Sequence, residues 1–182
     1  VGSEMCIRDR YWDVSNVTNM KNTFHGCKEF NQPLNWDVSK VTNMMQMFKC
    51  CEKFNQPLNW DVSKVTNMNF MFDRCEKFNQ VLNWDVSNVE SMIDMFYGCD
   101  NFNQPLDNWD VSNVHEMCNM FRGCLTFNQP LNNWDVSNVE NMSCMFYSCK
   151  KFNQPLDKWQ TTKVTNMQCM FKDCREFNKP LN

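Results

Sequence analysis

The chain repeats one pattern of hydrophobic and polar positions seven times, and a tryptophan marks each copy. The tryptophans are Trp12, Trp36, Trp60, Trp84, Trp109, Trp134 and Trp159. Counted from each tryptophan as position 1, the unit reads W-D-V-S-[NK]-V-x-x-M-x-x-M-F-x-x-C-x-x-F-N-Q-P-L-[ND], with a period of 24 residues in the early copies and 25 in the later ones. This period predicts a solenoid, because one copy is too small to bury its apolar face and a stack of copies shares a core.

Two shorter periodicities lie inside each unit. In the second copy, Leu34, Trp36 and Val38 alternate with polar residues, which predicts a half-buried strand. Positions 9, 12, 13 and 16 are apolar and follow the i, i+3, i+4, i+7 spacing of one helix face. We therefore expect an α/β repeat solenoid with irregular leucine-rich-repeat-like coils, each made of one short strand plus one short helix. The extra residue of the 25-residue copies predicts a bulge or a shifted turn before the tryptophan.

The motif WDVSNVTNM, followed by MF..C..FNQPLNNWDVSNV, stays in register from residue 12 to residue 182. It resembles the BspA-like repeat family, a divergent relative of the leucine-rich repeats found in bacterial surface proteins, mycoplasma lipoproteins and some protists. The resemblance implies an irregular leucine-rich-repeat solenoid at a cell surface or in a secreted protein, with adhesion or protein binding as its role. It implies no catalytic residues.

The first ten residues, VGSEMCIRDR, do not fit the repeat. They resemble a translated sequencing adapter, so residues 1–10 are treated as non-native and left out of the fold prediction. Residues 11–182 are predicted to form a single solenoid of seven repeats. Because solenoids usually end in atypical capping repeats, and neither end of the pattern has one, we expect a fragment of a longer array. The sequence contains no apolar run of about 18 residues that would predict a membrane span.

One cysteine per repeat occupies position 16, on the predicted inward face. These residues are Cys27, Cys51, Cys75, Cys99, Cys124, Cys149 and Cys174. We expect a ladder of reduced core thiols, because stacked helices lie about 8–10 Å apart and a disulfide needs Cα atoms within about 7 Å. Cys144 and Cys169 share position 11 in neighbouring repeats, and a disulfide between them stays open as an alternative.

Position 2 carries an aspartate in six repeats, namely Asp13, Asp37, Asp61, Asp85, Asp110 and Asp135. Stacked carboxylates repel one another, so the fold must compensate for their charge. In the favoured interpretation each aspartate accepts a hydrogen bond from the backbone N–H two residues on, in an Asx turn. In the alternative interpretation the row binds calcium.

Other site chemistry is not predicted. His25 and His115 stand at different repeat positions and there is no CxxC pair, so no zinc site is expected. The methionines at position 9 are interpreted as core residues, because methionine fills irregular gaps. With only four glycines there is no phosphate-binding loop, and neither a cofactor nor an enzymatic activity is expected. The net charge of −3, without a basic stripe, disfavours nucleic acid as a partner.

Variation from repeat to repeat is confined to the predicted outward positions. Tyr97, Arg122, Leu125 and Tyr147 stand out among them as candidate surface contacts, and Leu125 replaces a residue that is usually charged. The sequence therefore predicts a non-catalytic repeat scaffold that presents a variable surface to one or more protein partners. The alternative is a structural or assembly subunit that associates end to end through uncapped coil faces.

Overall fold

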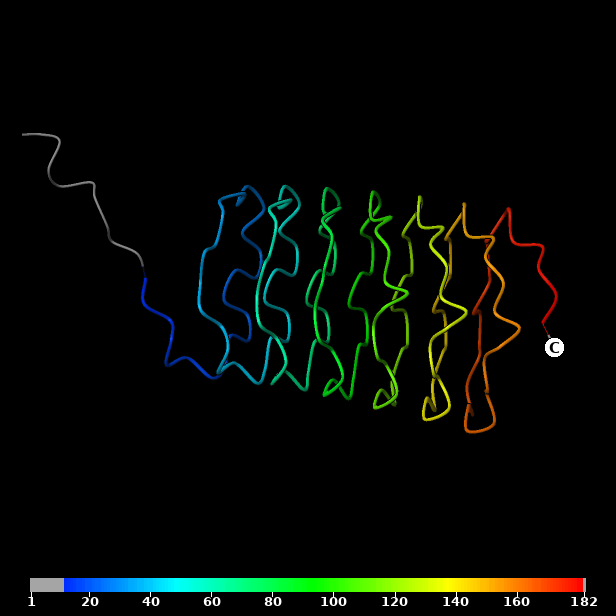
Figure 1. Cartoon of the computed structure of the whole chain (residues 1–182). Coiled ribbons are helices and arrows are strands. Elements are labelled where there is room, and N and C mark those ends of the chain that lie inside the picture. The colour runs from blue at the N-terminus through cyan, green and yellow to red at the C-terminus, as the bar shows by residue number, and fades with distance from the viewer. Residues whose placement is uncertain (1–11, 182) are drawn as a thin grey trace, which may run out of the picture.

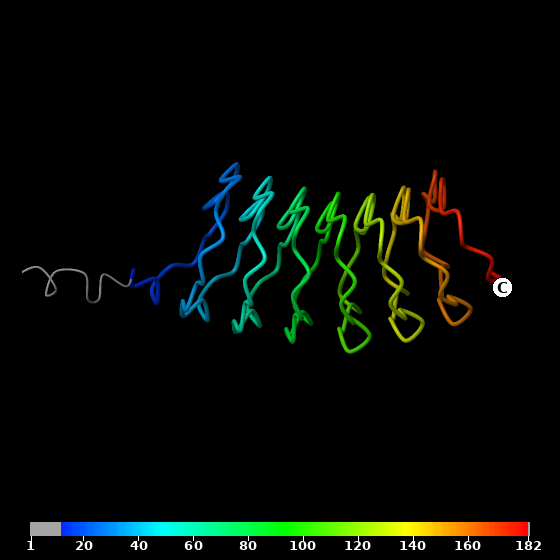
Figure 2. The same ribbon diagram turned by 90° about the horizontal axis from the view of Figure 1, so that it is seen from above.

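The computed structural model describes residues 12–181 of the chain. The seven repeats lie side by side in chain order (Figure 1), and the same order is seen from above (Figure 2). The described residues contain no helix and no extended strand. Isolated parallel β-bridges join position 8 of neighbouring repeats, in the chain of contacts Asn19, Asn43, Asn67, Ser91, Glu116, Asn141 and Asn166. The predicted α/β solenoid of leucine-rich-repeat-like strand-plus-helix coils is therefore wrong. The interpretation of residues 1–10 lies outside the described residues.

Backbone hydrogen bonds between repeats take the place of helix and sheet. The N–H groups at positions 9, 11, 13 and 15 donate to the carbonyls of positions 8, 10, 12 and 14 in the next repeat. In the second repeat these bonds run from Met44 to Asn67, from Gln46 to Asn69, from Phe48 to Met71 and from Cys50 to Asp73, with N···O distances of 2.7–3.1 Å. The N–H groups at positions 12, 14 and 16 donate three residues back within their own repeat. The backbone N–H and C=O groups of this segment are thus hydrogen-bonded, as burial requires.

Two positions in every repeat have a left-handed backbone, which no α-helix tolerates. At position 11 the φ angles are 54–62° and at position 15 they are 59–78°. The chain therefore runs through successive tight turns, and those that close from position 9 to 12 and from 13 to 16 have the positive φ at the third residue that a type II turn requires. These turns bring positions 9, 12, 13 and 16 to the inner side, as a helix would, which is why the apolar spacing was misleading.

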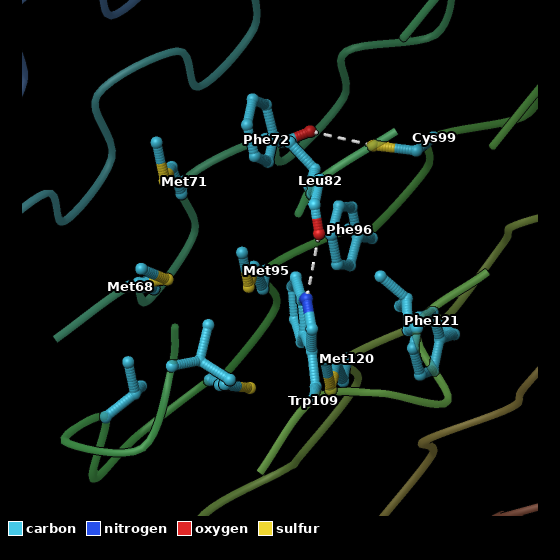
Figure 3. Close-up of a cluster of buried hydrophobic side chains, with 14 of the residues drawn as sticks. Met68, Met71, Phe72, Leu82, Met95, Phe96, Cys99, Trp109, Met120 and Phe121 are labelled. Carbon is cyan, nitrogen blue, oxygen red and sulfur yellow. Dashed lines mark hydrogen bonds between the residues drawn. The ribbon is translucent and has the colours of Figure 1, made fainter. Parts of the chain in front are cut away.

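The inward residues form continuous ladders along the stack (Figure 3). The Phe96 ring lies 5.6 Å from that of Phe72, 5.7 Å from that of Phe121 and 4.2 Å from that of Phe102 between centroids, with nearly parallel planes. The Trp109 Nε1–H donates to the carbonyl of Leu82 at 3.0 Å. The predicted inward positions 1, 3, 9, 12, 13, 16 and 23 are buried in the third to sixth repeats, as are the valine at position 6 and the phenylalanine at position 19. The assignment of the core residues was therefore correct even though the predicted backbone was not.

A second seam is made of amides at positions 20 and 21. The Asn79 Oδ1 accepts the backbone N–H of Asn103 and the Nε2–H of Gln104, both at 3.0 Å, and each neighbouring repeat repeats the arrangement. Stacked amides of this kind stabilise in-register parallel chains. Where the repeat lengthens to 25 residues, the Trp109 N–H donates to the Leu106 carbonyl at 3.1 Å and closes a turn. The shifted turn expected from the sequence is confirmed.

Candidate functional site

Positions 14 and 15 lie between the buried positions 13 and 16, and the succession of turns leaves their side chains at least partly exposed, with the exception of the buried Asp73. Tyr97, Arg122 and Tyr147 occupy position 14 in three consecutive repeats, and Lys172 follows them in the last. The Arg122 Cζ atom lies 4.6 Å from the Tyr147 ring centroid and 5.4 Å from that of Tyr97. The Lys172 Nζ atom lies 5.4 Å from the Tyr147 ring centroid. We call these four residues the Arg122 row.

A shallow depression of about 220 Å³ follows the Arg122 row. Its lining consists of Tyr97, Gly98, Arg122, Gly123, Tyr147 and Ser148. The two glycines have φ angles of 66° and 78° and leave the backbone of the depression uncovered. A surface of this shape lets the backbone of a ligand approach closely between aromatic walls.

Arg122 is the charged centre of the depression, and the residue as a whole is half-buried. It donates one long hydrogen bond, of 3.4 Å, from Nη1 to the Asn119 Oδ1. Within residues 12–181 no carboxylate lies within 4.0 Å of it, whereas Lys49, at the same position three repeats earlier, pairs with Asp73 at 2.7 Å. Burial raises the pKa of nearby Asp94, and Asp73 adds to this effect, while Arg122 opposes it. Arg122 is therefore placed to accept a carboxylate from another molecule.

The structure brings together three of the four predicted surface contacts. Leu125 lies at position 17, half-buried and outside the depression. The large apolar side chains that are exposed are Trp12, Val81, Met167 and Leu181. Neither the continuity of the Arg122 row into Lys172 nor the two glycines beside it was predicted from the sequence. Both can be found by aligning the repeats and comparing the residues at positions 14 and 15.

The cysteines at position 16 are hydrogen-bond donors inside the core. From the second repeat on, each thiol donates to the carbonyl of the position-13 phenylalanine in the preceding repeat, with Sγ···O distances of 2.7–3.0 Å. Burial raises the pKa of Cys51 to about 12 and that of Cys174 to about 11. It raises the pKa well above the ordinary thiol value for Cys75, Cys99, Cys124 and Cys149. These thiols stay neutral and unreactive at physiological pH.

The distance argument against disulfides in this ladder was wrong. Neighbouring repeats are joined by backbone hydrogen bonds, and the position-13 rings are only 5.5–5.8 Å apart between centroids, not 8–10 Å. The cysteines of the described residues are nevertheless free. The burial of this ladder also differs at its two ends, since Cys27 is exposed and Cys174 is half-buried. The inner thiols are buried and hydrogen-bonded, and the separation between repeats does not by itself exclude disulfides.

The aspartate row has local partners. In all six repeats the Oδ1 atom accepts the backbone N–H of the serine two residues on, at 3.0–3.1 Å. The serine side chain, and next its N–H, lower the pKa of Asp13, Asp37, Asp61, Asp85 and Asp135. The preceding aspartate raises the pKa of Asp37, Asp61 and Asp85, but by less. The geometry is that of the Asx turn, and no three His, Cys, Asp or Glu residues of the described chain gather to hold a metal.

Comparison with known proteins gives one family. A family model described as "Mycoplasma protein of unknown function, DUF285" matches the chain twice, over residues 5–83 and 80–182. No curated protein and no solved structure matches the chain. The matches show a repeat protein, whereas the leucine-rich-repeat class expected from the sequence finds no support in a backbone without helix or strand. No helix of residues 12–181 has the length and apolar character needed to cross a bilayer.

Proposed function

The chain belongs to the DUF285 repeat family, and from this premise we propose that it is a non-catalytic scaffold that binds an acidic segment of a protein partner along the Arg122 row. The observation that carries the proposal is the state of Arg122. Its guanidinium lies between two tyrosine rings and has no carboxylate partner in the described chain. A guanidinium held in this way matches the planar geometry of a carboxylate and can donate two parallel hydrogen bonds to it.

The surroundings of Arg122 favour a protein rather than a small molecule. Tyrosine and arginine are the residues that most often dominate the energy of protein interfaces, especially where partly buried. The depression is shallow and runs across three repeats, so an extended segment fits it better than a compact ligand. Lys172 continues the positive charge at the next repeat, 5.4 Å from the Tyr147 ring. An acidic peptide that follows the stack would meet Arg122 first and Lys172 next.

The direct test is the affinity of a fluorescently labelled glutamate-rich peptide, measured by anisotropy at low salt. Because a charge-assisted hydrogen bond contributes about 1.5–3 kcal/mol, we expect Arg122→Ala to weaken binding by about tenfold or more. Arg122→Lys keeps the charge but loses the planar guanidinium, and its affinity for the peptide should lie between that of the native chain and that of Arg122→Ala. Arg175→Ala removes an exposed arginine at position 17 and serves as the control. Equal affinities for Arg122→Ala and the control, with unchanged melting temperatures, would reject the proposal.

The resemblance to BspA-like repeats extends the proposal to adhesion at a cell surface. In that setting the acidic partner would belong to another cell or to the surrounding matrix. Antibody labelling of intact and permeabilised cells of the source tests this extension. Labelling only after permeabilisation would contradict the adhesion proposal, but it would not bear on the proposed binding of an acidic segment to the Arg122 row.

A second candidate, end-to-end assembly, has its own observation. The inter-repeat hydrogen bonds all point one way at positions 9–15, so within residues 12–181 the last repeat presents unused N–H groups and the first presents unused carbonyls. Apolar depressions of about 160 and 310 Å³ accompany these faces, around Trp159 and Trp36. Such complementary faces form open, head-to-tail contacts. Sedimentation velocity over a wide concentration range tests this: growth with concentration supports assembly, and a constant monomer contradicts it.

A further inference from the structure

Two cysteines outside the core ladder lie directly over one another. Cys144 and Cys169 occupy position 11 of the sixth and seventh repeats and share a left-handed backbone, with φ angles of 54° and 57°. The Cys144 N–H donates at 2.8 Å to the carbonyl of Gln168, the residue before Cys169. Both side chains are half-buried and reach the surface. The two residues are therefore equivalent steps of adjacent, hydrogen-bonded repeats.

The spacing of these repeats suits a disulfide. The rings of Phe146 and Phe171, two positions further on, are 5.7 Å apart and inclined by only 5°. Chains joined by parallel backbone hydrogen bonds lie about 4.8 Å apart, and disulfides join Cα atoms about 4.4–6.8 Å apart. Because Cys144 and Cys169 are equivalent positions of adjacent, hydrogen-bonded repeats, this spacing is compatible with a disulfide between them without a change of register.

The surroundings of the pair differ from those of the core thiols. No hydrogen bond to a carbonyl holds either thiol in the described chain, whereas every position-16 thiol from the second repeat on has one. Burial raises the pKa of Cys144, the Cys169 thiol raises it further, and Arg122 opposes both. Cys118, the nearest alternative partner, accepts a hydrogen bond from the Ser143 hydroxyl at 3.2 Å. The accessible pair is thus Cys144 with Cys169.

We propose that Cys144 and Cys169 form a redox modification site, which oxidised glutathione converts to a disulfide that joins the sixth and seventh repeats. The thiolate of one of the two cysteines attacks the sulfur–sulfur bond of glutathione disulfide, forms a mixed disulfide and releases one glutathione thiolate. The thiolate of the other cysteine then attacks the cysteine sulfur of the mixed disulfide and displaces the second glutathione. The two cysteine thiols are oxidised, one glutathione disulfide is reduced to two thiols, and the two protons pass to the released thiolates. The proposal does not depend on the acidic partner.

The disulfide lies beside the Arg122 row and ties down the seventh repeat, which is one of the two most exposed repeats of residues 12–181. Most residues of the seventh repeat are exposed, in contrast with those of the sixth. A covalent link to the sixth repeat limits the opening of this repeat and holds Lys172 close to Tyr147. Oxidation is therefore expected to slow amide exchange at Met170 and Lys172, whose N–H groups donate to the carbonyls of Met167 and Cys169, and to leave the second repeat unchanged.

The test is peptide mapping of the full native chain after incubation with glutathione disulfide, followed by alkylation and proteolysis without reductant. We expect a linked pair of peptides that contain Cys144 and Cys169, and loss of alkylation at both. Cys169→Ser should instead accumulate a stable mixed disulfide on Cys144, because the second thiol is missing. Cys50→Ser removes another half-buried thiol and should form the linked pair as the native chain does.

Three results would overturn the proposal. The first is free alkylation of both cysteines after oxidation. The second is a mixed disulfide on Cys144 that persists in the native chain. The third is a link from Cys144 to Cys118 in place of Cys169. Circular dichroism spectra that superimpose for the variants and the native chain establish that the stack is intact in each case.

Discussion

The aromatic ladder at position 13 and the Arg122 row at position 14 are neighbours in the sequence but opposite in character. Phe96 is fully buried against rings from three repeats, whereas Tyr97 is half-exposed over Arg122. Position 13 is phenylalanine in every repeat, and position 14 changes each time. Backbone hydrogen bonds hold both positions: the N–H at position 13 donates to the next repeat, and the N–H at position 14 donates three residues back within its own repeat. These bonds do not depend on the identity of the side chain. The buried side chains therefore specify the stacking of the repeats, and the residues of the outer rows can vary and acquire a binding role.

The largest expected effect comes from breaking the inner ladder. Phe96→Ala removes a ring packed 4.2–6.3 Å from four others and should lower the free energy of unfolding by about 3–5 kcal/mol. Tyr97→Ala, one residue along, should cost less than about 1 kcal/mol. Urea denaturation of both variants measures the difference. Similar losses for the two would show that the rows are not distinct.

The buried thiols predict a loss of stability at alkaline pH. Burial raises the pKa of Cys99 well above the ordinary 9.0. The contribution of this thiol to the free energy of unfolding is therefore complete below pH 9. It falls as the pH rises further, because the thiol then ionises in the unfolded chain but not in the folded one. One pH unit above that value the loss is about 1.4 kcal/mol for each such thiol. Cys99→Ala should therefore lose less stability than the native chain between pH 8 and pH 10. Parallel losses would place the thiol outside the core.

A smaller effect is expected from exchanging residues at position 15 between adjacent repeats. Gly123 has φ 78° and Ser148 has φ 61°, a conformation that costs an L-residue about 1 kcal/mol. Gly123→Ser should destabilise by about this amount, because its Cβ would meet only ordinary contacts, with the nearest atom at 3.5 Å. Ser148→Gly should stabilise to a similar extent. Thermal melts of the two variants check the opposite signs, and equal signs would contradict the backbone described here.

The smallest effect is expected at the exposed aspartate row. The Ser87 side chain and N–H lower the pKa of Asp85. The contribution of the ionised Asp85 carboxylate to the free energy of unfolding is therefore present above pH 3.8 and is lost as the pH falls below that value. Asp85→Asn keeps the oxygen acceptor but not the charge, and should cost less than about 0.5 kcal/mol at pH 7. Its stability should also change less than that of the native chain between pH 5 and pH 3. Urea midpoints at these values test both statements.

The sequence predicted the repeat, its inward residues and the turn in the longer copies. It could not predict the backbone between Met92 and Cys99, because an i, i+3, i+4, i+7 spacing arises equally from a helix and from successive tight turns. A signal against a helix was present at position 15, where Gly26, Gly98 and Gly123 lie in the last turn of the expected helix. It became decisive only with the left-handed φ angles in all seven repeats.

The candidate site was partly predictable for a related reason. Tyr97, Arg122 and Tyr147 were recognised as outward residues, but their mutual distances depend on the separation between repeats. The assumed helix packing made that separation too large, and it concealed the row. Once backbone hydrogen bonds join the repeats, residues at one position become neighbours.

The most direct test of the binding proposal is a nuclear magnetic resonance titration of the native chain with the glutamate-rich peptide, read residue by residue. We expect shifts confined to the Arg122 row and its glycines, and their disappearance in Arg122→Ala while the Phe96 signals stay in place. Shifts at Trp12 and Leu181 would move binding to the end faces. No shifts at Tyr97, Arg122 and Tyr147 at saturating peptide would contradict the assignment of this surface as the functional site.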